Sequence, residues 1–183
     1  MKLVKSILFI LVIVGYFVSC ASSGGYDVKD IPDFYLNPPS AEDAVYGVGD
    51  AKMSTLSMSR TMALSRARDD VARQVEGMVK NAITDYAQEA GAGKGAQVIN
   101  FAETVSRQIV EITLNGVKTK EVSAGKDGTI YAMVEYSAST FMDDAANVFE
   151  RSEEAAFAEF KAGQALDKLN FELKNNPTRA GGN

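Results

Sequence analysis

The feature that most constrains the fold is a long apolar stripe between Ser54 and Ala90. Its apolar residues recur every three or four positions: Leu64, Ala67, Val71, Val75, Met78, Ala82 and Tyr86. That spacing places them on one face of an α-helix of about ten turns. Because strand patterns lie on both sides of this segment, we expect the helix to cover a β-sheet with its apolar face. A coiled-coil seam is the alternative use of the same stripe.

A short strand is predicted immediately before the helix, in residues 44–51. The segment reads AVYGVGDA, in which Val45, Tyr46 and Val48 favour β structure. Gly47 and Gly49 have no Cβ, so we expect another backbone or helix to approach the strand closely there.

Two further strands are predicted after the helix. Residues 101–122 contain strand-forming side chains from Ile109 to Leu114, and Asn115-Gly116 suits a turn or a bulge in one long bent strand. A hairpin at Asp127-Gly128 leads into TIYAMVEYS, residues 129–137. That segment is apolar on both faces, which indicates a central strand.

A last amphipathic helix is predicted from Thr140 to Lys174, with Gly163 as a point of bending. It has more apolar surface than one small sheet needs, which indicates self-association, a partner, or packing on the long helix. The fold class is therefore α+β. We expect a small strand-helix-strand-strand domain with a long helix on the sheet and a C-terminal helix.

The loop between the long helix and the next element, residues 89–97, reads EAGAGKGAQ. Its Gly-Lys pair has a superficial likeness to a phosphate-binding loop. A Walker motif needs Ser or Thr after the lysine, whereas Gly95 follows Lys94 here. We therefore interpret the segment as a plain flexible loop.

The N-terminus has the order of an export signal. Lys2 and Lys5 precede a continuous apolar run from Ile7 to Val14, which is too short for a comfortable bilayer span. The residues FVSC then resemble the lipobox of bacterial lipoproteins, in which the cysteine is acylated and the signal is cut before it. That resemblance makes Cys20 the lipidation site; an ordinary signal with a leftover thiol, or an uncleaved anchor, is the alternative.

Composition argues against most enzyme classes. The chain has no histidine, so it lacks the commonest general base and the commonest metal ligand. One cysteine cannot form an internal disulfide or a thiolate metal cluster. The formal net charge of −5 gives no support to nucleic-acid binding. We expect no catalytic residue, no cofactor and no metal site.

Several segments in order resemble the LPP-twenty family of bacterial outer-membrane lipoproteins, which includes the flagellar lipoprotein FlgP. They are the lipobox, IPDFY, VYGVGDA, MALSRARDDVARQVEGMV, EITLNGVKTKEV and TIYAMVEY, over about residues 30–140. The resemblance implies a strand-helix-strand-strand α+β domain. It also implies that some relatives form rings or discs beneath the outer membrane around the flagellar motor.

These observations divide the chain into a signal peptide (1–19), a lipidated N-terminus and tether (20–43), a domain (44–138), a C-terminal helix (139–175) and a disordered tail (176–183). In the tether, we expect Phe34, Tyr35 and Leu36 to dock on the domain surface, partner binding being the alternative.

The predicted function is that of a non-catalytic, lipid-anchored envelope protein with a structural or assembly role on the periplasmic face of the outer membrane. The partners expected are the membrane through the acyl chains on Cys20, further copies of the chain, and flagellar or other envelope proteins. The alternative is a periplasmic module that binds peptidoglycan or another ligand in a cleft bordered by residues 44–51 and 89–97.

Overall fold

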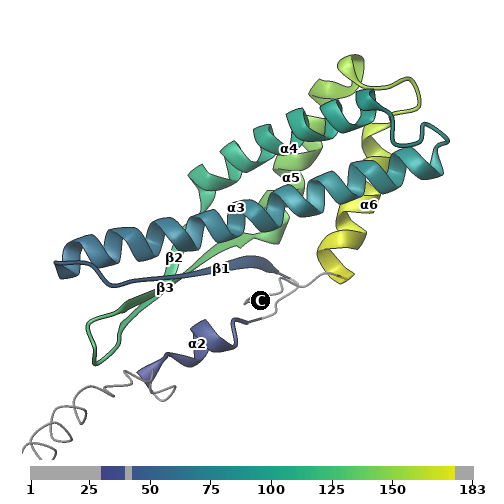
Figure 1. Cartoon of the computed structure of the whole chain (residues 1–183). Coiled ribbons are helices and arrows are strands. Elements are labelled where there is room, and N and C mark those ends of the chain that lie inside the picture. Colours follow the sequence, from purple (N-terminus) through teal and green to yellow (C-terminus); the bar gives the residue numbers. More distant parts are fainter. Residues whose placement is uncertain (1–29, 40–42, 176–183) are drawn as a thin grey trace, which may run out of the picture.

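The computed structural model describes residues 30–39 and 43–175 and confirms an α+β architecture (Figure 1). Cys20 and the predicted signal, most of the predicted tether and residues 176–183 lie outside the described residues. In chain order the elements are α2 (Asp33–Leu36), β1 (Ala44–Ala51), α3 (Leu56–Glu89), α4 (Ala96–Gly116), β2 (Lys118–Ala124), β3 (Ile130–Ser137), α5 (Ala138–Ser152), the 3₁₀ turn η3 (Glu153–Ala155) and α6 (Ala162–Asn175).

The three strands form one antiparallel sheet in the order β1-β3-β2, so β3 is central as predicted. Helix α3 lies across one face of this sheet, and the predicted close approach occurs at the two glycines of β1. A Cβ on Gly47 would lie 2.3 Å from the Ala67 carbonyl oxygen, and one on Gly49 would lie 2.4 Å from that of Ala63. Glycine is therefore required at both positions for β1 and α3 to pack this closely.

The opposite face of the sheet is partly covered by α2. Tyr35 donates a hydrogen bond from its hydroxyl to Asp50 Oδ1 at 2.7 Å, and its ring meets that of Tyr131 edge-on with centroids 5.0 Å apart. Phe34 packs against the buried cluster on this face that includes Met133. Docking is thus confirmed for Phe34 and Tyr35, whereas Leu36 is exposed.

The strand predicted within residues 101–122 is wrong for most of its length, because residues 96–116 form helix α4. The run from Ile109 to Leu114 is rich in β-branched residues, which favour a strand. Its buried members nevertheless follow a helical spacing, with Val105, Ile109 and Thr113 each four residues apart. Burial of that stripe against α3 outweighs the β propensity, since local propensity is weaker than tertiary packing. Only residues 118–124 pair as a strand.

The single C-terminal helix predicted for residues 139–175 is also wrong. Helix α5 ends at Ser152, and α6 begins at Ala162. The segment between them turns Phe157 and Phe160 inward, where both rings pack edge-on against Phe101, with centroids 5.9 and 4.7 Å apart. A continuous helix would have carried the chain away from this cluster, and burying two aromatic rings offsets the lost helical hydrogen bonds.

Helix α3 runs most of the length of the molecule and joins two differently built halves (Figure 1). Its first half covers the sheet. Its second half packs with α4, α5 and α6 around the aromatic cluster, to which Tyr86 contributes a ring and a hydroxyl that donates to the Glu159 carbonyl.

Candidate interaction surfaces

Three side chains of α3 close the outer edge of β1. They are spaced by four residues and form what we call the capping row: Arg66, Asp70 and Gln74. In the same order they hydrogen-bond to the Asp50 carbonyl at 2.7 Å, the Val48 amide at 3.1 Å and the Tyr46 carbonyl at 2.9 Å. An edge strand with free backbone groups is a template for pairing with another strand. The capping row occupies three of these groups, one each on Tyr46, Val48 and Asp50, and so hinders strand addition at β1.

The other edge of the sheet carries lysines. Lys118 and Lys120 are exposed on β2, and Lys120 Nζ lies 2.6 Å from Glu135 Oε2 and 3.2 Å from the Tyr46 hydroxyl. The hydrogen bond to Glu135 raises the pKa of Lys120 above its usual value, and the bond to Tyr46 acts in the same direction. Both residues line an open hollow of about 560 Å³ at this end of the sheet. These contacts favour the charged form of Lys120 at this edge of the sheet.

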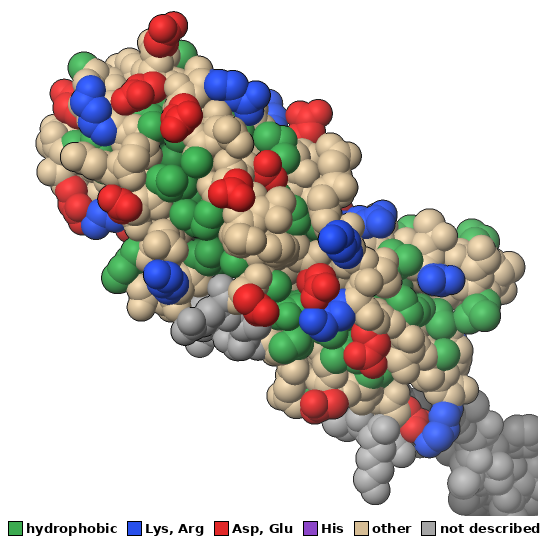
Figure 2. Space-filling view, turned by 180° about the vertical axis from the view of Figure 1, so that it is seen from behind, with side chains coloured by type: hydrophobic (Ala, Val, Ile, Leu, Met, Phe, Trp, Pro, Cys, Tyr) green, Lys and Arg blue, Asp and Glu red, His purple; other side chains and the backbone are tan. Residues whose placement is uncertain are grey.

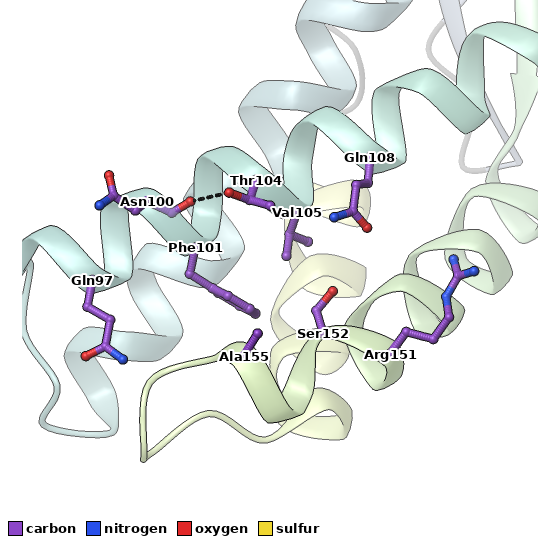
Figure 3. A pocket seen from close by; sticks show the side chains of 9 residues that line it. All are labelled: Gln97, Asn100, Phe101, Thr104, Val105, Gln108, Arg151, Ser152 and Ala155. Carbon is purple, nitrogen blue, oxygen red and sulfur yellow. Dashed lines mark hydrogen bonds between the residues drawn. The ribbon is translucent and has the colours of Figure 1, made fainter.

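A groove of about 820 Å³ runs between α4 and α5 (Figure 3). The residues that line this α4–α5 groove are Gln97, Asn100, Phe101, Thr104, Val105, Gln108, Arg151, Ser152 and Ala155. The α4 members recur at helical spacing, so one face of that helix forms one wall. In Figure 3, Phe101 and Val105 point across the groove toward Ser152 and Ala155 of the opposite wall.

Two polar side chains of the groove are hydrogen-bonded to backbone carbonyls of their own helices. The Thr104 hydroxyl donates to the Asn100 carbonyl at 2.8 Å, and Arg151 Nε donates to the Asn147 carbonyl at 3.0 Å. Both bonds fix a side chain against its own helix. The lining contains one cation, Arg151, and no carboxylate.

Large apolar side chains are exposed where α3 begins. This apolar group consists of Met53, Leu56, Met58 and Met62. Leu56 is 68% exposed and Met58 49% exposed. Figure 2 shows hydrophobic side chains at the surface of this narrower end of the molecule. Methionine adapts its shape to different neighbours, so a methionine-rich patch suits protein contact.

The structure does not assemble the ligand cleft predicted from residues 44–51 and 89–97. Strand β1 packs on α3 near Ala63, Ala67 and Val71, whereas the loop follows Glu89 at the other end of that helix. The 18 residues between Val71 and Glu89 span about 27 Å. The α4–α5 groove was missed because its α4 wall was assigned to a strand. The signal available for it was the spacing of Gln97, Thr104 and Gln108.

Within residues 30–39 and 43–175, no three side chains of the His, Cys, Asp or Glu type are grouped as metal ligands would be. No helix in that part of the chain is both long enough and apolar enough to cross a bilayer. The predicted lipidation site, Cys20, precedes the described residues.

Comparison with known proteins identifies one family. The model of the LPP20 lipoprotein family matches residues 32–137, which extends from the start of α2 to the end of β3. A search of curated proteins finds no match.

Proposed function

Because this chain belongs to the LPP20 lipoprotein family, we propose that it is anchored in the outer membrane through acyl chains on Cys20 and acts there by assembling with other envelope proteins. Family membership implies a membrane-anchored envelope protein. We propose four further points: the anchoring residue, the choice of membrane, the absence of catalysis and the assembly role.

The observation that carries the proposal is the position of Cys20 relative to the family match. Cys20 follows the predicted export signal, residues 1–19, and lies twelve residues before the start of the matched region, residues 32–137. A domain preceded by a lipobox cysteine is arranged for attachment to a lipid surface. Two or three acyl chains hold a protein stably on a membrane, where one chain binds only marginally.

The residue after Cys20 supports the outer membrane as the destination. It is Ala21, and an aspartate at that place is what retains many bacterial lipoproteins in the inner membrane. The absence of histidine from the whole chain supports a non-catalytic role, because the commonest proton-transfer residue is missing.

The apolar group at the start of α3 supports assembly. Leu56, Met58 and Met62 expose large apolar surfaces within seven residues of one another. Such surfaces are unfavourable in water and become favourable contacts when another protein covers them. Further copies of the chain and flagellar or other envelope proteins are the partners that we propose.

The first experiment is intact mass and detergent-extracted size of the native protein from its own membranes. We expect the mass of the chain from Cys20 onward plus acyl groups, in a large discrete assembly. Cys20→Ala should abolish the acyl mass. An unmodified Cys20 in the native protein would contradict the anchor.

Assembly is tested separately with Met58→Gln/Met62→Gln in the acylated protein. We expect the assembly to dissociate while the acyl mass stays, because the change makes the apolar group polar without touching the core. Arg60→Gln/Arg68→Gln is a matched control on exposed positions of the same helix. Monomeric native protein would contradict the assembly role and leave the anchor standing.

A further inference from the structure

We propose that the α4–α5 groove binds an extended peptide that carries a free carboxylate. This inference concerns a site and a ligand class that the envelope role does not specify. It does not depend on acylation at Cys20, since the groove lies wholly within α4, α5 and η3.

Helix α4 presents a ladder of primary amides to the groove. Gln97, Asn100 and Gln108 line the groove, and within the described residues none of these side-chain amides hydrogen-bonds to another residue. A primary amide presents a donor and an acceptor side by side, which matches the N–H and C=O groups of a peptide backbone. The ladder is therefore suited to a ligand that offers both kinds of group repeatedly.

The length of the ladder sets the length of the ligand. The 11 residues from Gln97 to Gln108 correspond to about 16 Å of helix. An extended peptide advances about 3.3 Å per residue, so about five residues lie along the ladder. A groove of about 820 Å³ is large enough to hold part of such a chain.

The groove also presents one positive charge to a ligand. Arg151 is the one charged residue among those that line the groove. Its Nε is held by the Asn147 carbonyl, which leaves both Nη groups without a partner in the described residues. A guanidinium held in this way pairs well with a carboxylate, through short and charge-assisted hydrogen bonds. We therefore place the carboxylate end of the peptide at Arg151.

The aromatic content of the groove favours a peptide over a saccharide as its ligand. Sugar rings commonly stack on an open aromatic face, and Phe101 is the one aromatic side chain in the lining. Phe101 is only 7% exposed, and Phe157 and Phe160 meet its ring edge-on. Since that ring is already occupied by protein contacts, the groove offers amides and a cation but no stacking platform.

The test is calorimetric titration of the full chain in detergent with N-acetyl-penta-alanine as the free acid and as the C-terminal amide. We expect the free acid to bind about 10-fold more tightly than the amide, as befits one charge-assisted contact. Arg151→Gln should abolish this difference. Arg107→Gln, an exposed arginine on α4 outside the lining, should preserve it. Circular dichroism verifies that each variant is folded.

Titration with a cell-wall stem pentapeptide, in which D- and L-residues occur together, distinguishes two sources of a peptide with a free carboxylate. Tighter binding of the stem pentapeptide indicates the cell wall, and tighter binding of the all-L peptide indicates the C-terminal segment of a protein. Either result supports the carboxylate site. The proposal is overturned if no free acid binds saturably, if acid and amide bind equally, or if Arg151→Gln leaves their difference intact. Preferential binding of a wall disaccharide without stem peptide also overturns it.

Discussion

The two edges of the sheet are protected in different ways. At the β1 edge, the capping row of α3 bonds directly to backbone groups at 2.7–3.1 Å. At the β2 edge, protection comes from exposed charge, with Lys118 and Lys120 on the strand itself. The hydrogen bonds at β1 form only when α3 lies close to the strand, whereas the charges at β2 act without contact with another element. The β1 edge thus depends on the packing of α3 against the sheet, whereas the β2 edge is an exposed surface that a few substitutions can change.

The largest effect is expected where α3 and β1 touch. In Gly47→Ala the new Cβ would lie 2.3 Å from the Ala67 carbonyl oxygen, so helix and strand must separate. We expect a loss of about 3 kcal/mol in the free energy of unfolding, measured by urea denaturation. The separation should also weaken the capping row.

Gly77→Ala is the matched control, because nothing lies within 4 Å of a Cβ built at this α3 position. Replacing a helix-interior glycine with alanine should stabilise the protein by about 0.5–1 kcal/mol. Equal effects at Gly47 and Gly77 would show that α3 and β1 do not pack as closely as the structure has them.

The second effect concerns the capping row itself. Asp70→Ala removes the acceptor of the Val48 amide and leaves that group without its partner. We expect about 2 kcal/mol of destabilisation, the range for a hydrogen bond to a charged group. Hydrogen exchange at the Val48 amide should quicken. Asp69→Ala is the control, since Asp69 is exposed on the same helix. An unchanged hydrogen-exchange rate at the Val48 amide would mean that Asp70 does not protect the β1 edge.

These two edges also show what could be predicted from the sequence. The glycines of VYGVGDA and the stripe of residues 54–90 predict the contact of β1 with α3, because both patterns are local. The capping row joins residues such as Val48 and Asp70, 22 positions apart, and no periodicity indicates which polar side chains of a helix face a strand edge.

The errors in the helical half have a related cause. The run Ile109–Leu114 was assigned by composition, and its helical period emerges only when Val105, Ile109 and Thr113 are counted together. The break after Ser152 is set by the contacts of Phe157 and Phe160 with rings from other helices. Such contacts depend on the assembled fold. The α4–α5 groove lies between these two misassigned segments and was missed for that reason.

A smaller effect is expected from alkaline pH at the β1 side. Burial, followed by the hydrogen bond to Asp50, raises the pKa of Tyr35 above its usual value. An unfolded tyrosine loses its proton near pH 10, before the folded one does. The stability from this contact is therefore complete below about pH 10 and is lost as the pH rises further.

Urea midpoints of the parent and Tyr35→Phe, compared from about pH 9 to about pH 11, measure this contribution. Because Tyr35 is only half-buried, we expect the parent to lose about 0.5 kcal/mol more than the variant over that range. Contributions from residues that make no contact with Tyr35 are the same in both proteins and cancel in the comparison. Parallel pH profiles would mean that α2 is held by its apolar contacts alone.

The smallest effect on stability, with a distinct effect on association, is expected at the β2 edge. Lys118→Val/Lys120→Val removes exposed charge from an edge strand and raises its β propensity. We expect only a small fall in the urea midpoint, from the loss of the contacts of Lys120 with Glu135 and the Tyr46 hydroxyl. We do expect a concentration-dependent increase in size by sedimentation velocity, because the edge can now pair with that of a second copy. Lys94→Val/Lys161→Val removes the same charge at exposed positions outside any strand and should not have this effect. If the control associates as strongly, the lysines of β2 prevent association only by keeping the protein soluble. Strand pairing at the β2 edge would then not explain the association.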